Sequence, residues 1–443
     1  MRENRRAAPD FSALQGRHVL IALSGGPDSV ALAVMLADVQ EAMHLRLSAA
    51  HLDHGIRPES ADDAEWCAVL CSELHIPFFT ARVDVPAEAA RTGEGLETVA
   101  RRLRRRWLED LRKRLGADCI ALAHHMDDQA ETVLMHLARG TGPEGIGGMS
   151  AISGTLVRPL LWMRKRDLVQ FLTDRGFTWR EDATNALADT PRNALRLYGI
   201  PELEKSYPGF VPAAARYALS AGIESDYVAA QTSQWLKDNL FTGPYGRYLS
   251  LEQRPHPAIL RRSIRAICGS DLSWAKLNAV AALADAARGS TEVSGGLIAE
   301  KGRRGLYFLR GNPPVESESP LLTDGITRLS DICEITARPI GAVPIRDEPM
   351  RQALDFDALQ GAVLRTRRPG DRIRPLGCGD KLLSDFYTDR KLDRPLRDFT
   401  ALIARGRRVL WVCGLGISEE AAISAGTQRA VELTCRYHFA RWI

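Results

Sequence analysis

Apolar and polar residues alternate in two different rhythms along residues 1–215. Short apolar runs typical of buried strands occupy 18–24, 45–51, 78–83, 119–123 and 156–157. Longer segments with a helical spacing of apolar residues lie between them, at 29–41, 60–75, 94–115 and 128–139. This alternation predicts an α/β fold with a doubly wound parallel sheet. Ligands bind such sheets at the C-terminal ends of the strands.

The pattern changes after residue 215. Residues 216–312 have mainly helical spacing and close with a strand-like pair near 295–309, which predicts a mainly helical middle domain. Residues 313–350 are predicted to be a linker, because the segment 311–320 at their start has the composition of a linker, with three Pro and two Ser. Residues 351–443 contain short strand-like runs and predict a small α+β C-terminal domain.

The most informative motif follows the first predicted strand. Its six residues are Ser24, Gly25, Gly26, Pro27, Asp28 and Ser29. Adjacent glycines allow a sharp turn and a close approach of a ligand. The N–H groups of the turn and of the following helix then face one point, where anionic oxygens can bind. The motif predicts a phosphate or pyrophosphate cradle, although it contains no lysine and lacks the common GxxxxGK[ST] pattern.

Composition narrows the class of protein. The chain has 443 residues, of which 45% are apolar and 26% charged, as in ordinary soluble proteins of two or three domains. No run approaches the roughly 18 apolar residues of a membrane span, so we expect a soluble, cytoplasmic protein. The eight cysteines are scattered and none forms CxxC, which is typical of reduced thiols.

Positive charge gathers in two places. Residues 361–443 contain 16 Lys and Arg against 9 Asp and Glu, whereas the whole chain has a net charge of +4. Residues 101–114 contain eight basic side chains. A basic surface is typical of polyanion binding, although solvation alone also accounts for such runs.

Two polar clusters follow predicted strands. His51 and His54 flank Asp53 at the end of the second strand, where nucleotide recognition, capping of a turn or metal binding would each suit them. His124 precedes a group of acids that includes Asp128 and Glu131, three residues apart on one helix face. These acids suit a cationic substrate or magnesium, or cap the helix N-terminus.

Together these segments resemble the tRNA(Ile)-lysidine synthetase family. The loop alone resembles only the pyrophosphatase loop of N-type ATP pyrophosphatases. The order of motifs is more specific, and it covers most of 18–200 and 361–414: SGGPDS, HLDHGIR, ETVARRLRRRW, AHHMDDQAET, RPLL, DATN…PRNALR and RRPGDRI…KLL…WVCG. Two departures leave the charged positions in place, namely Trp107 for the usual tyrosine and Asp182-Ala-Thr-Asn for the usual Asp-Pro-x-Asn.

The resemblance implies a ligase that uses ATP and Mg²⁺. Enzymes of this family adenylate C2 of the wobble cytidine (position 34) of the CAU-anticodon isoleucine tRNA, releasing pyrophosphate. The ε-amine of free L-lysine then attacks C2 and AMP leaves. We therefore expect this tRNA and lysine as partners and no membrane, and a homodimer stays open.

Two alternatives stay open. One is another adenylating enzyme of the same loop class, such as a tRNA thiolase, which the absence of CxxC disfavours, or an amidating synthetase, for which no glutaminase-like domain is visible. The other is a non-catalytic protein that binds RNA or senses a nucleotide, against which the intact loop and the acid cluster argue.

The resemblance also assigns roles to residues. The expected catalytic residues are Asp28, Arg101, His124, Asp128 and Glu131. ATP is expected to contact Ser24, Gly25, Gly26, Pro27, Asp28, Ser29, His51 and Arg101, with magnesium brought by ATP and not held by a protein cluster. Lysine is expected to bind Asp128, Glu131 and Arg192. The tRNA is expected to contact Arg104, Arg105, Arg368, Arg372 and Lys381.

Overall fold

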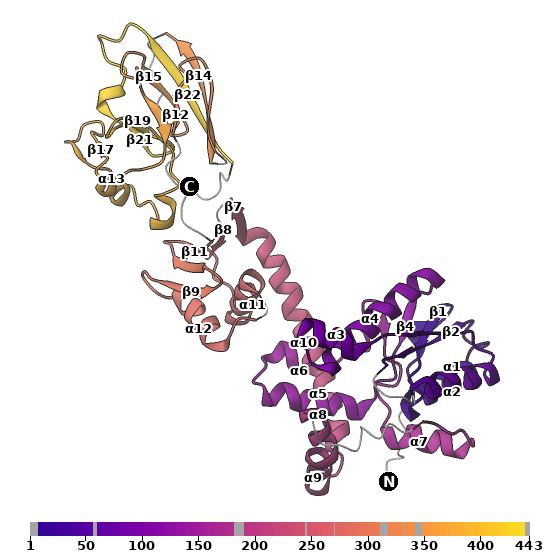
Figure 1. Cartoon of the computed structure of the whole chain (residues 1–443). Helices are drawn as coiled ribbons and strands as arrows, with labels where there is room; N and C mark the ends of the chain where they lie inside the picture. Colours follow the sequence, from indigo (N-terminus) through magenta and orange to yellow (C-terminus); the bar gives the residue numbers. More distant parts are fainter. Residues whose placement is uncertain are drawn as a thin grey trace. The chain divides into compact units, whose positions relative to one another are not determined.

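A computed structural model describes residues 8–55, 60–180, 190–243, 246–269, 271–310, 318–330, 332–341 and 348–438. The chain forms two compact units, Met1–Tyr227 (unit 1) and Val228–Ile443 (unit 2) (Figure 1). Each unit has its own buried core.

Unit 1 is built on one sheet. Within its described residues, six strands pair in the order β3-β2-β1-β4-β6-β5. The pairs are parallel except for β5 with β6. The bounds are β1 His18–Ala22, β2 Arg46–Asp53, β3 Phe78–Arg82, β4 Cys119–Ala121, β5 Ile152–Ser153 and β6 Leu156–Val157. The predicted parallel sheet is confirmed.

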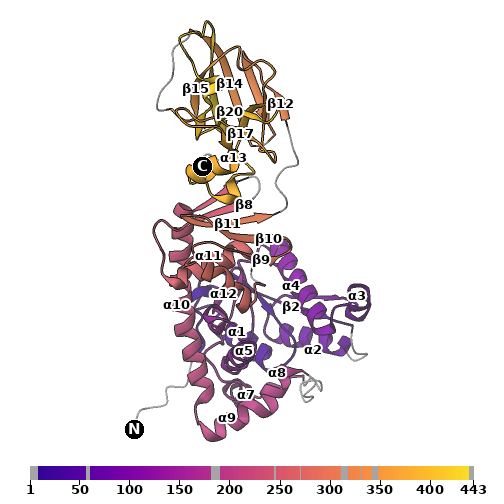
Figure 2. The same ribbon diagram turned by 90° about the vertical axis from the view of Figure 1, so that its left-hand side faces the viewer.

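Helices cover both faces of this sheet (Figures 1 and 2). Alternate residues of β1 point to opposite sides, so Val19 and Ile21 pack in a core with α1 and α2, and Leu20 packs with Leu108 of α4. The helices are α1 Pro27–Asp38, α2 Ser60–Glu73, α3 Val85–Thr92, α4 Leu96–Leu115, α5 Met126–Ala138, α6 Pro143–Ile146, α7 Lys165–Asp174, α8 Pro191–Ala194, α9 Ile200–Ser206 and α10 Phe210–Asn239. None of the described helices is both long and apolar enough to cross a membrane.

The strand order creates a crevice at β1. The chain passes from β1 to β2 and β3 on one side, and then crosses to place β4 on the other side of β1. The loops after β1 and β4 therefore diverge at their carboxyl ends. Such a switch point is where open α/β sheets bind ligands.

Unit 2 begins with a mixed layer of helices and strands. Its described residues include a five-stranded antiparallel sheet in the order β7-β8-β11-β10-β9, packed against α11 and α12. The bounds are β7 Leu240–Gly243, β8 Gly246–Ser250, β9 Ser290–Ser294, β10 Leu297–Lys301, β11 Gly305–Arg310, α11 Pro257–Cys268 and α12 Trp274–Leu283. The sequence indicated the pair β10 and β11, but not the other three strands.

Two further sheets form the rest of unit 2. In the described residues, one has the order β12-β16-β19-β20-β17-β18 with β21 beside β20, and the other has the order β13-β14-β22-β15. The bounds are β12 Glu318–Pro320, β13 Gly325–Leu329, β14 Cys333–Ile340, β15 Arg351–Asp355, β16 Val363–Arg365, β17 Arg372–Ile373, β18 Lys381–Leu382, α13 Leu383–Asp389, β19 Leu402–Arg405, β20 Arg408–Val412, β21 Gly416–Ile417 and β22 Ala430–Tyr437.

The linker predicted for 313–350 is therefore wrong over much of its length. Strands β13 and β14 lie within it, and Leu329, Ile332 and Ile335 are fully buried. The opening of the segment is rich in Pro and Ser, and this composition masked the apolar alternation that follows. Pairing with the distant strand β22 supplies the partner that makes these residues a sheet.

A buried ion pair connects the end of β16 with the residue that precedes β17. Both nitrogens at the end of the Arg365 guanidinium donate to Asp371 at 2.8 Å, and both side chains are 1% exposed. The same guanidinium donates to the backbone carbonyls of Thr366 and Gly406, and Asp371 also accepts from the backbone N–H of Arg368. Arg365 and Asp371, which lie beside the predicted tRNA contacts Arg368 and Arg372, therefore have a structural role.

We predict that Asp371→Ala destabilises unit 2. The change leaves the buried guanidinium of Arg365 without its carboxylate, which costs about 3–5 kcal/mol in comparable pairs. Chemical denaturation followed by circular dichroism measures the loss. The control is Asp380→Ala, which removes an acid from more exposed pairs with Arg372 and Arg408 and should cost much less stability. Equal losses in the two variants would contradict the prediction.

Candidate active site

The glycine-rich loop turns sharply between β1 and α1. Gly25 has a φ of +85°, a conformation that L side chains rarely adopt, and Gly26 is the N-cap of α1. Ser29 closes the loop, because its Oγ accepts from the backbone N–H of Ser24 at 3.1 Å and donates to the carbonyl of Gly26 at 2.9 Å. The two serine hydroxyls lie 3.0 Å apart. The predicted cradle is thus held in shape by its own serines.

A distant segment braces the loop. The backbone N–H of Arg180 donates to the carbonyl of Gly25 at 2.9 Å, and the Arg180 side chain pairs with Asp63 of α2 at 2.7 Å. The motif residues Arg57, Asp182, Thr184 and Asn185 lie outside the described residues.

His125 connects the two predicted halves of the site. Its Nδ1 accepts from the backbone N–H of Asp128, and Asp128 in return accepts from the backbone N–H of His125, so His125 caps α5. Its Nε2 lies 3.5 Å from the Asp28 carboxylate in the loop. Burial alone would lower the pKa of His125, but the hydrogen bond with Asp28 and the nearby acids raise it. The expected start of this helix at Asp127 or Asp128 is corrected, because Met126 is its first residue.

Asp28 keeps part of its carboxylate available. Its Oδ2 lies near His125 and, at 3.8 Å, near the ammonium of Lys165. Its Oδ1 is buried and accepts no hydrogen bond from any described residue. Magnesium prefers oxygen ligands and often takes only one or two carboxylates beside substrate phosphates. Asp28 fits that role, and the described residues contain no group of three or more His, Cys, Asp or Glu placed to hold a metal.

Asp128 and Glu131 form a compact charge cluster with two arginines, which we call the quartet. Arg192 donates to Glu131 at 2.7 Å and to Asp128 at 3.1 Å. Arg196 donates to Glu131 at 2.6 and 3.0 Å and to Asp128 at 3.1 Å. Both acids are buried, so paired guanidinium groups offset the cost of desolvating them. The structure brings Asp128, Glu131 and Arg192 together as predicted, and adds Arg196.

Asp127, the remaining acid of the cluster after β4, binds Arg164 and not the arginines of the quartet. Asp127 accepts from the Arg164 guanidinium at 3.0 to 3.2 Å and from the backbone N–H of Lys165 at 2.8 Å. Arg164 also pairs with Glu204 of α9. This network fastens the start of α7 to the start of α5 and leaves Asp127 out of the quartet.

Two histidines near the loop are under the influence of Arg104. His51 is buried, and its Nδ1 lies 3.1 Å from the carbonyl of Leu23. Burial is the main cause that lowers the pKa of His51 and of His54, and the charge of Arg104 lowers both further. The charge of Arg104 therefore acts on both histidines, although the resemblance assigns this residue to the tRNA.

His124 is neutral at physiological pH in this arrangement. Burial lowers its pKa to about 4, and the positive charges of Arg158, Arg192 and Arg104 contribute. The Nδ1 of His124 is buried without a hydrogen-bond partner in the described residues. The neutral imidazole of His124 therefore lies near three arginines, and its Nδ1 can form a hydrogen bond with an anionic or polar ligand.

A basic cavity of about 790 Å³ adjoins the quartet. Its walls come from α4, the end of α5 and the start of α8, and Arg192 of the quartet also lines it. The lining residues are Glu97, Thr98, Arg101, Arg102, Arg105, Arg106, Glu109, Met135, Arg139, Thr190, Pro191 and Arg192. Arg101 and Arg105 thus share one cavity, as a polyanion site requires.

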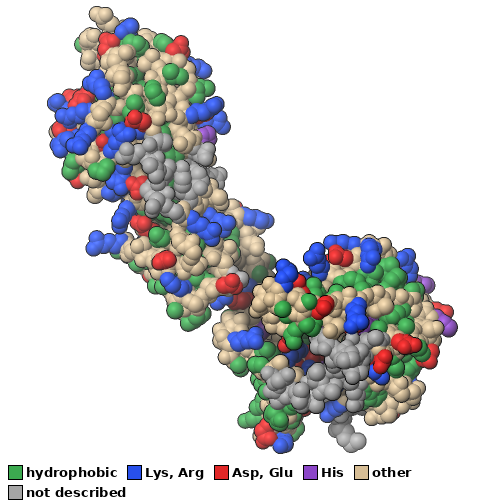
Figure 3. All heavy atoms as spheres, in the orientation of Figure 1, with side chains coloured by type: hydrophobic (Ala, Val, Ile, Leu, Met, Phe, Trp, Pro, Cys, Tyr) green, Lys and Arg blue, Asp and Glu red, His purple; other side chains and the backbone are tan. Residues whose placement is uncertain are grey.

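The predicted tRNA contacts of unit 2 lie on a surface of mixed charge. Arg368 pairs with Glu318, Arg372 with Asp380 and Lys381 with Asp389, at 2.7 to 2.9 Å. Figure 3 shows blue and red side chains interspersed over this part of unit 2. These pairs are partly exposed, so phosphates compete with carboxylates at a modest cost.

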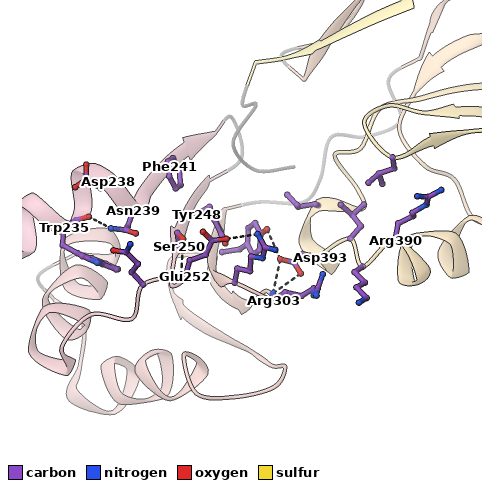
Figure 4. A pocket seen from close by; sticks show the side chains of 17 residues that line it. Trp235, Asp238, Asn239, Phe241, Tyr248, Ser250, Glu252, Arg303, Arg390 and Asp393 are labelled. Carbon is purple, nitrogen blue, oxygen red and sulfur yellow. Dashed lines mark hydrogen bonds and ion pairs between the residues drawn. The ribbon is translucent and has the colours of Figure 1, made fainter. Parts of the chain in front are cut away.

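A second cavity, of about 710 Å³, lies within unit 2. Figure 4 shows Asp393 bonded to Arg303, with Tyr248, Trp235 and Arg390 also lining the cavity. None of the predicted site residues lines this cavity.

Sequence reasoning missed four residues of the site. His125, Arg196, Lys165 and Arg180 all stand inside or beside the motifs, but their partners come from other segments. Spacing along one segment carries no information on such pairs. The one available signal was an arginine four residues after Arg192, a spacing that puts both side chains on one face of a helix.

The chain matches known families in both units. Residues 2–203 match the PP-loop domain, and residues 362–433 match the TilS substrate C-terminal domain. A tRNA(Ile)-lysidine synthase of Symbiobacterium thermophilum is 33% identical, over 95% of this chain and 94% of that protein. The enzyme of the same name from Geobacter sulfurreducens is 31% identical, over 93% and 92%.

A solved structure, the U34-tRNA thiolase NcsA of Methanococcus maripaludis, aligns with 48% of this chain and 74% of its own, at 18% identity and a TM-score of 0.41. The sequence relatives decide the assignment, since they are similar along nearly their whole length. With its pyrophosphate loop, its quartet and its C-terminal module (residues 351–443), this chain belongs to the tRNA(Ile)-lysidine synthase family.

Proposed function

We propose that the chain joins free L-lysine to C2 of cytidine 34 in the CAU-anticodon isoleucine tRNA, at the expense of ATP. The products are lysidine, AMP and pyrophosphate. One observation carries the proposal: His125 links Asp28 of the pyrophosphate loop to the acids of the quartet, so a nucleotide site and a site for a charged amino acid lie side by side. The family assignment gives this pair of sites its substrates.

The loop and its surroundings suit the adenylation step. N–H groups of the turn and of the α1 N-terminus face the phosphates, and Asp28 faces magnesium brought by ATP. The cytidine O2 attacks the α-phosphorus, and pyrophosphate leaves with the electrons of the broken bond. Positive charge near the α-phosphate stabilises this transition state. Arg101 is our candidate for that charge, and we add Arg104 because its charge lowers the pKa of both His51 and His54.

The quartet suits the headgroup of lysine. An α-amino acid carries an ammonium and a carboxylate side by side, so it can insert between an acid and an arginine and leave every charge paired. In this arrangement Asp128 and Glu131 bind the α-ammonium, and Arg192 or Arg196 binds the carboxylate. The ε-amine is then left to reach C2.

The attacking amine must first lose a proton, because an unperturbed lysine has a pKa near 10.4. His124 is the candidate acceptor. With a pKa of about 4 it is a poor base in the ligand-free protein. Negative charge on the bound nucleotide would raise that pKa, while the nearby arginines would lower the pKa of the ammonium.

The tRNA is proposed to lie against the basic cavity of unit 1 and the C-terminal module. Arg105, Arg368, Arg372 and Lys381 are proposed to contact phosphates, which orient a bound RNA without reading its sequence. Arg106 and Arg139 line the same cavity and join this set.

The deciding experiment supplies purified protein with ATP, magnesium, radiolabelled lysine and the CAU-anticodon isoleucine tRNA. We expect ATP-dependent label in acid-precipitated RNA that survives mild base, which an aminoacyl ester would not. Pyrophosphate release without label would retain adenylation but reject lysine as the nucleophile. Sulfide or ammonia would then be tried as the second substrate.

We predict that Glu131→Gln weakens lysine binding selectively. Loss of one charged hydrogen-bonding partner is worth about 1.5–3 kcal/mol, so the KM for lysine should rise about 10- to 100-fold. Single-turnover pyrophosphate release without lysine should be little changed. Glu88→Gln is the matched control, since Glu88 also binds two arginines but lies on α3. Equal losses in the two half-reactions would contradict the assignment.

We predict that nucleotide binding raises the pKa of His124. Imidazole NMR should give a value near 4 in the free protein and a value at least one unit higher with the α,β-methylene analogue of ATP. His124→Ala identifies the resonance, and it should also slow single-turnover lysine transfer. An unchanged pKa together with unchanged transfer would remove His124 from the mechanism.

We predict that charge reversal at Arg368 and Arg372 weakens tRNA binding and spares ATP binding. Binding should also become less dependent on salt, because fewer phosphates are neutralised and fewer counterions are released. Filter binding at several salt concentrations measures both effects. Arg254→Glu, which reverses another paired surface cation of unit 2, is the control. A parallel loss of ATP affinity would count against this division of roles.

A further inference from the structure

The pyrophosphate loop lacks a cation of its own. Residues Ser24 to Ser29 contain one acid and no basic side chain. In the common phosphate loops a lysine within the motif reaches the β- and γ-phosphates. Backbone N–H groups alone would face the growing charge of a departing pyrophosphate here, so a cation from another element is expected.

Lys165 lies where such a cation is needed. It is the first residue of α7, and its ammonium is 3.8 Å from Oδ2 of Asp28 in the loop. Its backbone is fixed, because its N–H donates to Asp127 at 2.8 Å. Its side chain is 39% exposed, so the ammonium is held near the loop and is still accessible to a ligand.

Four neighbouring arginines are held more firmly by their acids. Arg164 is buried between Asp127 and Glu204, with every contact at 3.0 to 3.2 Å. Arg180 pairs with Asp63 at 2.7 Å, and the arginines of the quartet bind their acids at 2.6 to 3.1 Å. The looser contact of Lys165 with Asp28 is the one that a bound phosphate can replace at least cost.

We propose that Lys165 is the phosphate-binding cation of the loop, supplied from α7, and that it contacts the β- or γ-phosphate of ATP. In the free protein Asp28 holds it in place. When Mg²⁺ bound to ATP approaches Asp28, the ammonium is free to turn to the phosphates. This inference rests on the proposed function only for the use of ATP.

The contact acts in the adenylation step. The bond from cytidine O2 to the α-phosphorus forms, and the bond from that phosphorus to the bridging oxygen breaks. The electron pair goes to pyrophosphate, whose added negative charge the Lys165 ammonium stabilises as a point charge. Lys165 transfers no proton.

Binding of inorganic pyrophosphate and of AMP separates this role from others. In Lys165→Ala we expect affinity for pyrophosphate, measured with magnesium present, to fall about 10- to 100-fold, while affinity for AMP is unchanged. The α,β-methylene analogue of ATP should lose affinity to a similar extent. Lys165→Arg should restore most of the loss, because it keeps the charge.

Arg166→Ala is the matched control. Arg166 neighbours Lys165, is 75% exposed and pairs only weakly with Asp167 at 3.9 Å. The Arg166→Ala variant should bind pyrophosphate and AMP with the same affinities as the unsubstituted protein. The midpoint of thermal unfolding should be similar in all the variants.

Two results would overturn the inference. One is unchanged pyrophosphate affinity in Lys165→Ala. The other is an equal loss for pyrophosphate and AMP, which would indicate a general disturbance of the loop or a contact with the α-phosphate. Neither measurement contains tRNA or lysine. Failure of the lysine-incorporation assay would therefore reject the proposed function and leave this result intact.

Discussion

The contact between His125 and Asp28 joins the two parts of the site. One imidazole caps α5 through Nδ1 and approaches the pyrophosphate loop through Nε2. Because the cap fixes where α5 begins, it also fixes where Asp128 and Glu131 project. A shift of the loop would therefore move the amino acid site with it. The rest of the chemistry depends on this spacing, since an adenylated base and an attacking amine must meet within a few ångströms.

The sequence was sufficient to predict the parallel sheet of unit 1, the loop and the acids after β4. Each of these features lies within one continuous segment of the sequence, where an apolar run is followed by a turn or by clustered carboxylates. Partners that meet across segments were not predictable. Nothing in the order of residues pairs Arg196 with Glu131, or Lys165 with Asp28. Strand β14 was missed for the same reason, because its pairing partner β22 lies far along the chain, and β13 pairs in turn with β14.

Charge is used differently in the two units. In unit 1 several arginines of α4 share a cavity with only two glutamates, so the local field favours an anion. In the C-terminal module the predicted RNA-binding cations already have carboxylate partners. Such pairs exchange partners readily at a polar surface, so the proposed contacts with phosphates would be reversible. The buried pair of Arg365 and Asp371 takes no part in this exchange.

The position of β22 has a consequence for biosynthesis. This strand lies between β14 and β15, both of which leave the ribosome earlier. Until residues 430–437 emerge, β14 can pair only with β13, and β15 lacks its partner in this sheet. Unit 1 contains the complete pyrophosphate loop and quartet, and its sheet includes no strand from residues 430–437. During translation the residues of the candidate active site are therefore complete before the last sheet of unit 2 can form. In the interval the nascent chain exposes unpaired strand edges, which are prone to aggregation.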